Sequence, residues 1–304
     1  MIIAVASGKG GTGKTTIATS LALSLIGEIR SALPINASSP LLFLDCDVEA
    51  PNAHLFLKPV FNQRQEVGIL IPQVDEGKCS HCGTCAQVCQ YHAIAVLGKQ
   101  TLVFSQLCHG CGSCTLMCPE NAISETLQVM GVLEGGPTPS GVYFARGVLN
   151  IGEPMAVPLI RQLKAWIKPG VDQLVIVDAP PGTSCPVVES VNSADFLLLV
   201  TEPTPFGFHD LKLAVEVARE LQIPAGVVLN RCEGDSPEFS YGTVVDAYCH
   251  EQGLPILLRI PFEREIAAGI AQGKNLTEIK PDLVPALQRM FTQITAGMQV
   301  GVNI

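Results

Sequence analysis

Charged side chains are scarce in this sequence, and long apolar runs are missing from it. Only 15% of its 304 residues are charged while 47% are apolar, a balance that excludes a disordered chain. No apolar run reaches the roughly 18 residues of a membrane-spanning helix. The first apolar stretch runs into a glycine-rich loop and lacks the pattern of a signal peptide. We therefore expect a globular, cytoplasmic protein without a membrane span.

Basic residues are too few to dominate the surface. Lys and Arg number 19 against 28 Asp and Glu, which gives a net charge of −9. Such a chain lacks the positive excess with which proteins bind a nucleic-acid backbone, so we expect no nucleic-acid partner. The length suggests about two domains.

A glycine-rich loop lies between a predicted strand at residues 2–6 and a helix-periodic run from residue 17 to residue 25. From Gly8 to Thr15 it satisfies G-x-x-x-x-G-K-[ST], in which backbone N–H groups and the helix N-terminus cradle phosphates. A chance glycine turn is the alternative. We expect ATP to bind here, with Lys14 reaching its β- and γ-phosphates and Thr15 ligating Mg²⁺. The loop residues predicted to bind the nucleotide are Gly8, Lys9, Gly10, Gly11, Thr12, Gly13, Lys14, Thr15 and Thr16.

Acidic residues end two short apolar runs, which are predicted as buried parallel strands. Asp45 and Asp47 follow residues 41–44, and Asp178 follows residues 174–177. The carboxyl ends of parallel strands form the edge where α/β proteins bind ligands. We predict that Asp45 and Asp178 hold Mg²⁺ and that Asp47 orients a catalytic water, with Lys14 and Asp47 as catalytic residues. The loop has a further lysine, Lys9, which ordinary P-loops do not require. Helix caps or turns are the alternative roles for such aspartates.

Eight of the 12 cysteines lie in two C-x₂-C-x₂-C-x₃-C runs. The second run begins 29 positions after the first, and this duplicated spacing is typical of bacterial ferredoxins, in which the fourth cysteine of each run ligates the other cluster. Zinc is the alternative. A reducing compartment argues against disulfides. We predict two 4Fe–4S clusters, the first on Cys79, Cys82, Cys85 and Cys118, the second on Cys108, Cys111, Cys114 and Cys89. The histidines among these cysteines are predicted to have loop or surface roles.

The remaining pattern alternates apolar strands with periodic helices, which predicts an α/β, doubly wound, mostly parallel sheet. Residues 1–71 and 127–304 are predicted to form one discontinuous domain of this kind, interrupted at residues 72–126 by an α+β, ferredoxin-like insert. Residues 31–40 are predicted as a loop, and the Gly- and Pro-rich stretch 129–158 as the connection that leads back to the sheet. Later strands are expected at residues 196–200, 226–229 and 256–260, and helices at 157–166, 208–221, 244–252, 263–271 and 283–298.

With these motifs together, the chain resembles the MinD/ParA-type P-loop ATPases, and within them a subfamily with an inserted ferredoxin domain. The run from Lys9 to Thr16 matches their deviant Walker A motif, and residues 201–211 and 260–265 also resemble family segments. The resemblance implies a dimer closed around ATP, with itself or with a paralogous ATPase, in which Lys9 reaches the partner's ATP. It also implies that Asn230, Pro261 and Phe262 border the adenine.

Two further families show a more distant likeness. The chain resembles the nitrogenase iron protein, where Cys185 matches one ligand of the cluster between the subunits, but Tyr143 stands at the other ligand position. Mrp-type cluster carriers use a C-x-x-C late in the sheet, whereas Cys232 and Cys249 here are isolated. A bridging cluster is therefore not expected.

Three functions follow as hypotheses. The first is an ATPase that couples its nucleotide state to electron transfer through two 4Fe–4S clusters, with an unidentified redox partner. The second is an iron–sulfur assembly or carrier ATPase that hands clusters to an apo-protein acceptor. The third is a scaffold whose dimerisation ATP controls; residues 295–304 lack the basic polar face of a membrane-binding helix.

Overall fold

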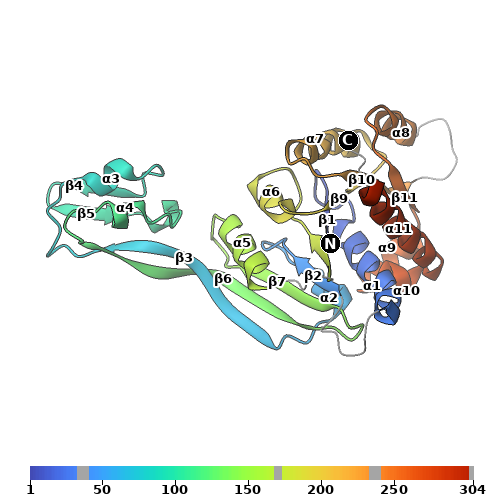
Figure 1. Cartoon of the computed structure of the whole chain (residues 1–304), viewed down its shortest axis with the longest axis horizontal. Coiled ribbons are helices and arrows are strands. Elements are labelled where there is room, and N and C mark those ends of the chain that lie inside the picture. Colours follow the sequence, from blue (N-terminus) through green and yellow to red (C-terminus); the bar gives the residue numbers. More distant parts are fainter. Residues whose placement is uncertain (33–40, 168–172, 233–240, 301–304) are drawn as a thin grey trace. The chain divides into compact units, whose positions relative to one another are not determined.

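The computed structural model describes residues 1–32, 41–167, 173–232 and 241–300 (Figure 1). The chain divides into two compact units. Most of the predicted loop at 31–40 and the last four residues lie outside the described ranges. Within those ranges, no helix has the length and apolarity needed to cross a membrane. Unit 1 consists of Met1–Arg64, Leu133–Val148 and Ile160–Ile304, and unit 2 consists of Gln65–Val132 and Leu149–Leu159.

One sheet has the strand order β11-β10-β9-β1-β8-β2-β7-β6-β3. Every described pairing from β11 to β7 is parallel, which confirms the mostly parallel α/β sheet. The strands of unit 1 are β1 (Ile2–Ala6), β2 (Leu41–Asp45), β7 (Tyr143–Leu149), β8 (Leu174–Asp178), β9 (Phe196–Thr201), β10 (Ala225–Cys232) and β11 (Ile256–Pro261).

The helices of unit 1 cover this sheet. Figure 1 shows α1 and α11 on one side of it and α5 and α6 on the other. The predicted helices are confirmed, with ends shifted by a few residues. The helices that were predicted are α1 (Lys14–Ala32), α5 (Val157–Trp166), α7 (Pro205–Glu220), α8 (Tyr241–Glu251), α9 (Arg264–Ala271) and α11 (Val284–Val300). The short elements α2 (His54–Leu57), α6 (Cys185–Val191), α10 (Leu276–Ile279) and the 3₁₀ turn η2 (Pro281–Leu283) were not predicted.

The central strands are buried on both faces because their sequences are continuously apolar. All residues of β2, β8 and β9 are buried, as expected for a parallel sheet covered by helices. Phe43 of β2 and Phe144 of β7 are fully buried, and their rings stack with centroids 5.9 Å apart. The same packing leaves the acidic residues that end β2 and β8 without access to water.

Two long strands, β3 (Gln63–Val74) and β6 (Ile123–Pro137), each have residues in both units. Their neighbouring backbone hydrogen bonds join Asn62 to Gly135 and Asp75 to Ala122, so the numbers rise on one strand as they fall on the other. The pair is therefore antiparallel. The predicted connection back to the sheet is made over residues 129–137 by β6, which was not predicted as a strand. Gly136 is a strand residue whose missing Cβ lets the Val60 carbonyl approach.

Unit 2 contains a two-stranded antiparallel sheet and short helices. The sheet pairs β4 (Ile94–Leu97) with β5 (Gln100–Val103). A small core includes Cys85, Ile94 and Ile123. The remaining elements are α3 (Thr84–Val88), the 3₁₀ turn η1 (Ser105–Leu107) and α4 (Ser113–Leu116).

Candidate functional site

The glycine-rich loop joins β1 to α1 and is held from two sides. Gly11 and Gly13 have φ of 82° and 93°, a backbone region that favours glycine. The carbonyl of Ser7 accepts a hydrogen bond of 2.9 Å from the N–H of Gly182, which lies just beyond β8. Gly8 contacts Asp210 of α7 so closely that a Cβ at Gly8 would overlap the Asp210 backbone. The loop is therefore fixed in a curved conformation that turns backbone N–H groups toward a ligand.

Asn230, near the end of β10, anchors the far side of the same loop. Its Nδ2 donates to the Thr12 carbonyl at 2.7 Å, and its Oδ1 accepts from the Arg231 N–H at 2.9 Å. The amide occupies space that a Cβ at Gly13 would need. Asn230 was expected beside the adenine from resemblance alone. It lines the candidate cavity, and its amide group also positions the phosphate loop.

The buried acids Asp45 and Asp178 are paired in register at the ends of β2 and β8. Both are fully buried. Asp45 accepts hydrogen bonds from the N–H groups of Ala53 at 3.1 Å and Asp47 at 3.3 Å, so it organises the loop after β2. Asp178 differs, because neither of its oxygens accepts a hydrogen bond of ordinary geometry from the described residues. Its nearest charge is Lys14, whose Nζ lies 3.8 Å from Oδ1.

Burial raises the pKa of both acids. For Asp45 the rise is large, and the neighbouring Asp178 carboxylate adds to it. For Asp178, Lys14 and Thr15 oppose the effect of burial. Burial also raises the pKa of the partly buried Asp47, against the pull of Lys14. Carboxylate oxygens without hydrogen-bond donors, beside a hydroxyl, suit Mg²⁺, which prefers oxygen ligands. Asp178 and Thr15 therefore fit a magnesium ion, with Asp45 behind them.

A cavity of about 470 Å³ opens beside this loop. Several of the predicted residues line this cavity: residues of the glycine-rich loop, Asp47, and the group Asn230, Pro261 and Phe262. Gly8, Lys9, Thr12, Asp45 and Asp178 are not among its described lining residues. The predicted residues that do line it are Gly10, Gly11, Gly13, Lys14, Thr15, Thr16, Asp47, Asn230, Pro261 and Phe262.

Sequence reasoning missed part of the cavity wall. Arg231 and one face of α9, including Ile266 and Ile270, also line it. The spacing of the α9 residues predicts an apolar helix face. That spacing alone does not distinguish a helix face that covers a ligand from one that covers the core.

Lys9 is not among the described lining residues of the cavity and forms an ion pair within its own chain. Its Nζ lies 3.4 Å from Oε1 of Glu202, the residue after β9. Arg231 Nη1 lies 3.3 Å from Oε2 of the same carboxylate. Glu202, which was not predicted as a site residue, therefore joins Lys9 to an arginine of the cavity wall.

The eight clustered cysteines of unit 2 form two groups of four. All twelve cysteines of the chain are free thiols. Each group of four lines one hollow and combines three cysteines of one run with the fourth of the other, which is the exchange that the spacing predicted. The first hollow is lined by Cys79, Cys82, Cys85 and Cys118, the second by Cys108, Cys111, Cys114 and Cys89.

The two halves repeat in detail. Thr84 lies 3.4 Å from Cys82 Sγ and Ser113 lies 3.5 Å from Cys111 Sγ, and these hydroxyls lower the pKa of the two thiols. Backbone N–H groups donate to sulfur at equivalent positions of the two runs. They are His81 to Cys79, Gly110 to Cys108, Ala93 to Cys89 and Ala122 to Cys118, at 3.3 to 3.4 Å. Converging thiols with N–H donors aimed at sulfur suit iron–sulfur clusters.

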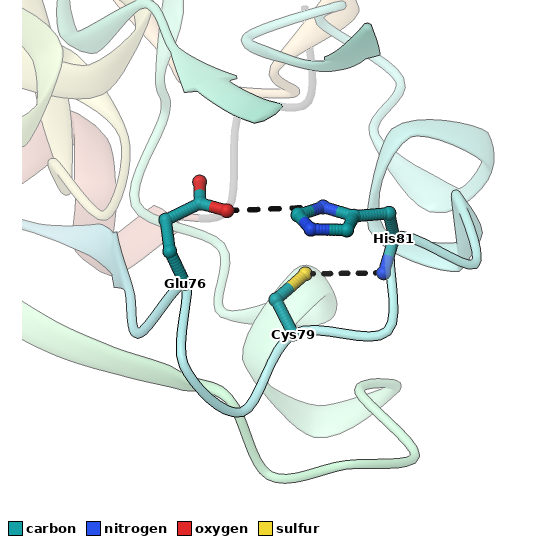
Figure 2. A group of neighbouring side chains, drawn as sticks. All are labelled: Glu76, Cys79 and His81. Atoms are coloured by element: carbon teal, nitrogen blue, oxygen red, sulfur yellow. Dashed lines mark hydrogen bonds and ion pairs between the residues drawn. The ribbon is translucent and has the colours of Figure 1, made fainter. Parts of the chain in front are cut away.

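Figure 2 shows a mixed group at the start of the first run. The Glu76 carboxylate points toward the His81 ring, with Oε2 3.7 Å from Nδ1, and the His81 N–H donates to Cys79 Sγ. Their possible ligand atoms lie within 4.8 Å of one another. His81 lies in a loop, as predicted, and its backbone N–H donates to a predicted cluster cysteine, Cys79.

Comparisons with known proteins agree with this geometry. Residues 3–276 match the family described as the CobQ/CobB/MinD/ParA nucleotide binding domain. An uncharacterized protein of Methanocaldococcus jannaschii is 32% identical over 258 residues, which are 82% of this chain and 89% of that protein. The iron-sulfur cluster carrier protein of Aquifex aeolicus is 26% identical over 291 residues, which are 92% of this chain and 63% of that protein. The septum site-determining protein MinD of Pyrococcus horikoshii, complexed with Mg-ADP, shares the fold, with a TM-score of 0.54, 19% identity and coverage of 100% of this chain and 98% of that one.

The contact between Asn230 and the loop predicts a specific effect on nucleotide binding. Asn230→Ala removes the donor to the buried Thr12 carbonyl, which costs about 1 to 3 kcal/mol when an acceptor is left unpaired. We expect Mg-ADP to bind roughly tenfold more weakly, by isothermal titration calorimetry. Asn230→Asp keeps the acceptor for Arg231 but cannot donate to Thr12, so it should weaken binding too. Unchanged affinity in both variants would contradict the anchoring role.

The buried acid pair predicts a pH effect. Because the pKa of Asp45 is raised, the Mg²⁺-free folded chain holds this proton more tightly than the unfolded chain. The contribution of Asp45 to the free energy of unfolding therefore falls as the pH rises from about 4, its unfolded value. Asp45→Asn removes this dependence and keeps an acceptor oxygen. We expect the free energy of unfolding of the variant, minus that of the wild type, to increase with pH by about 1.4 kcal/mol per unit of raised pKa.

Urea titrations in EDTA, from about pH 4.5 to about pH 8, measure this difference. The comparison cancels groups that do not interact with Asp45, so the difference reports Asp45 together with its repulsion of Asp178. A difference that is flat or decreases over this range would show that Asp45 ionises normally in the folded chain.

Proposed function

The chain belongs to the CobQ/CobB/MinD/ParA nucleotide-binding family, and we propose that it is an ATPase whose second unit carries two 4Fe–4S clusters. ATP would occupy the cavity beside the glycine-rich loop, with Lys14 on its β- and γ-phosphates. Thr15 and Asp178 would hold Mg²⁺, and Asp45 would support that shell. Asp47, which lines the cavity, would orient the attacking water. Family membership and the orphaned Asp178 oxygens support these roles.

The site would be completed by a second subunit, either another copy of this chain or a paralogous ATPase. In this proposal Lys9 supplies positive charge to the partner's phosphates, comparable in role to an arginine finger. Asn230, Pro261 and Phe262 would border the adenine. The position of Lys9 outside the lining of its own cavity supports a role beyond its own nucleotide.

The proposal treats residues 72–126 as a ferredoxin-like domain inserted into an ATPase domain of residues 1–71 and 127–304. The two groups of four cysteines would each hold one 4Fe–4S cluster. Such clusters, when bound, accept and release single electrons. The supporting observation is that each group takes its fourth cysteine from the other run.

We infer that nucleotide state and electron transfer are coupled, with a redox partner that receives or supplies electrons. The observation that carries this inference is the path of the chain. The loop containing Asp47 continues through α2 into β3, which leads directly to Cys79. A change of the Asp47 loop on ATP binding would therefore act on the segment that enters the cysteine-bearing unit.

A second candidate function is delivery of iron–sulfur clusters to an apo-protein. Its support is the likeness to the Aquifex aeolicus iron-sulfur cluster carrier protein over 92% of this chain. The two candidates make opposite demands on the clusters, because a carrier must release what an electron carrier must retain. A scaffold whose dimerisation alone responds to ATP would require neither cluster release nor redox coupling.

Cluster content is the first prediction of this proposal. Protein purified without oxygen should contain about eight iron and eight sulfide per chain. Cys79→Ser and Cys108→Ser each remove one ligand from a different group, so each should lower the iron content by about half. Cys249→Ser, at a buried cysteine of α8 in unit 1, is the control and should retain the full content. One zinc per group would refute the clusters.

The coupling is the second prediction. ATP hydrolysis, measured by phosphate release, should differ severalfold between oxidised and dithionite-reduced protein, and Lys14→Ala should abolish it in both states. Equal rates in the two redox states would refute coupling. Transfer of labelled iron to an apo-ferredoxin, faster with ATP than with ADP, would then select the carrier function; clusters that resist a chelator throughout would reject it.

A further inference from the structure

The carboxylate of Glu202 forms ion pairs with two cations at once. Lys9 Nζ lies 3.4 Å from one oxygen and Arg231 Nη1 lies 3.3 Å from the other. The Glu202 side chain is only 12% exposed, whereas that of Lys9 is 31% exposed. The carboxylate is therefore the least exposed of the three groups, since the Arg231 side chain is 46% exposed. Arg231 is tied through its N–H to Asn230, so we take Lys9 as the cation that leaves.

The backbone around Glu202 is fixed by the turn from β9 to α7. Its carbonyl accepts from the Thr204 N–H at 2.8 Å, and Gly207 packs so closely on this carbonyl that a Cβ there would overlap it. The Thr201 hydroxyl donates to the Gly207 carbonyl at 2.8 Å. These contacts hold the carboxylate beside the base of the phosphate loop.

Arg231 is held on the opposite side. Its N–H donates to Asn230 Oδ1, and its own φ is 56°. Asn230 in turn donates to Thr12 in the phosphate loop. The arginine side chain lines the nucleotide cavity while its guanidinium pairs with Glu202, so Glu202 keeps one cation when the other departs.

We propose that Glu202 is a positioning residue that holds Lys9 within its own subunit until the phosphates of ATP in a second copy of the chain replace it. The proposal rests on the trans role of Lys9 in the proposed function. Moving Lys9 exchanges one carboxylate for a triphosphate of greater charge. Because Arg231 stays with Glu202, the carboxylate is not left buried and unpaired, and the exchange avoids the large cost of an isolated buried charge.

This arrangement sets a threshold for dimerisation. A ligand with fewer phosphate charges attracts the Lys9 ammonium less strongly than ATP does, so it competes less well with Glu202 for Lys9. The ion pair thus favours the free subunit and makes the dimer depend more steeply on the γ-phosphate. Weakening the Lys9–Glu202 ion pair should shift the equilibrium toward the dimer. The size of the shift is the difference in the free energy of this one contact between the free subunit and the dimer.

Glu202→Gln tests the proposal, because it keeps the shape of the side chain and removes its charge. A partly exposed ion pair contributes modestly, so with Mg²⁺ and a non-hydrolysable ATP analogue the dimer dissociation constant should fall about two- to fivefold. Sedimentation velocity measures it. Asp246→Asn removes another carboxylate–arginine pair, with Arg259 at 2.6 Å, and should leave the constant unchanged. An unchanged or weaker dimer in Glu202→Gln would overturn the proposal.

The double variant separates this inference from the function on which it rests. In a Lys9→Ala background, Glu202→Gln should have no effect on dimerisation, because the cation that it holds is gone. An equal effect in both backgrounds would mean that Glu202 acts through something other than Lys9, and would overturn the proposal. If Lys9→Ala alone dimerises and hydrolyses ATP like the wild type, the trans role itself fails. If Lys9→Ala is impaired while Glu202→Gln matches the wild type, only the holding role of Glu202 fails.

Discussion

The burial of Asp45 and Asp178 side by side is the constraint on which the nucleotide-binding unit depends. Two carboxyl groups in register at the ends of buried strands repel each other when both are ionised, and Lys14 is the cation beside Asp178. Asp45 is balanced by backbone N–H groups, which ties it to the loop after β2, whereas Asp178 has no such donor within the part of the chain that the structure describes. The chain therefore holds a local deficit of positive charge at one point. We propose that Mg²⁺, bound with its nucleotide, supplies this missing positive charge. The free energy of their binding would then also stabilise the folded state of this site.

Much of the fold of unit 1 could be predicted because its signals are local. Continuous apolar runs such as residues 41–44 identify strands buried on both faces, and the glycine pattern from Gly8 to Thr15 identifies the turn between β1 and α1. The strand pair β3 and β6 escaped prediction because its signal is not local. Gly136, which reads as a chain breaker, is required there by the approach of the Val60 carbonyl, and no short window of sequence contains both residues.

The candidate site also combines residues that local sequence patterns predict with contacts that they do not predict. Lys14, Thr15 and the eight cysteines follow from spacing, because each motif places its ligands within a few residues. The contacts of Asn230 with Thr12 and of Glu202 with Lys9 join residues about 200 positions apart, and only the folded sheet, which sets β9 beside β1 and β10 beside β9, brings them together. His81 illustrates a different limit, since its side chain meets Glu76 through a left-handed backbone, φ 57°, at the position where the repeat has Gly110.

The anchoring of the phosphate loop and the holding of Lys9 share one short segment. Asn230 donates a hydrogen bond to the Thr12 carbonyl, and the next residue, Arg231, shares the Glu202 carboxylate with Lys9. A nucleotide that contacts the cavity wall at Arg231 would weaken its pairing with Glu202 and strengthen the hold on Lys9, because one carboxylate would then serve one cation. A nucleotide that leaves Arg231 in place keeps Glu202 satisfied and Lys9 easier to remove. In the proposal that Lys9 acts in a second subunit, whether a ligand promotes association would therefore depend on which of the two cations it engages. This gives Arg231 a part in distinguishing ligands that the loop alone, which binds any suitable phosphate, cannot supply.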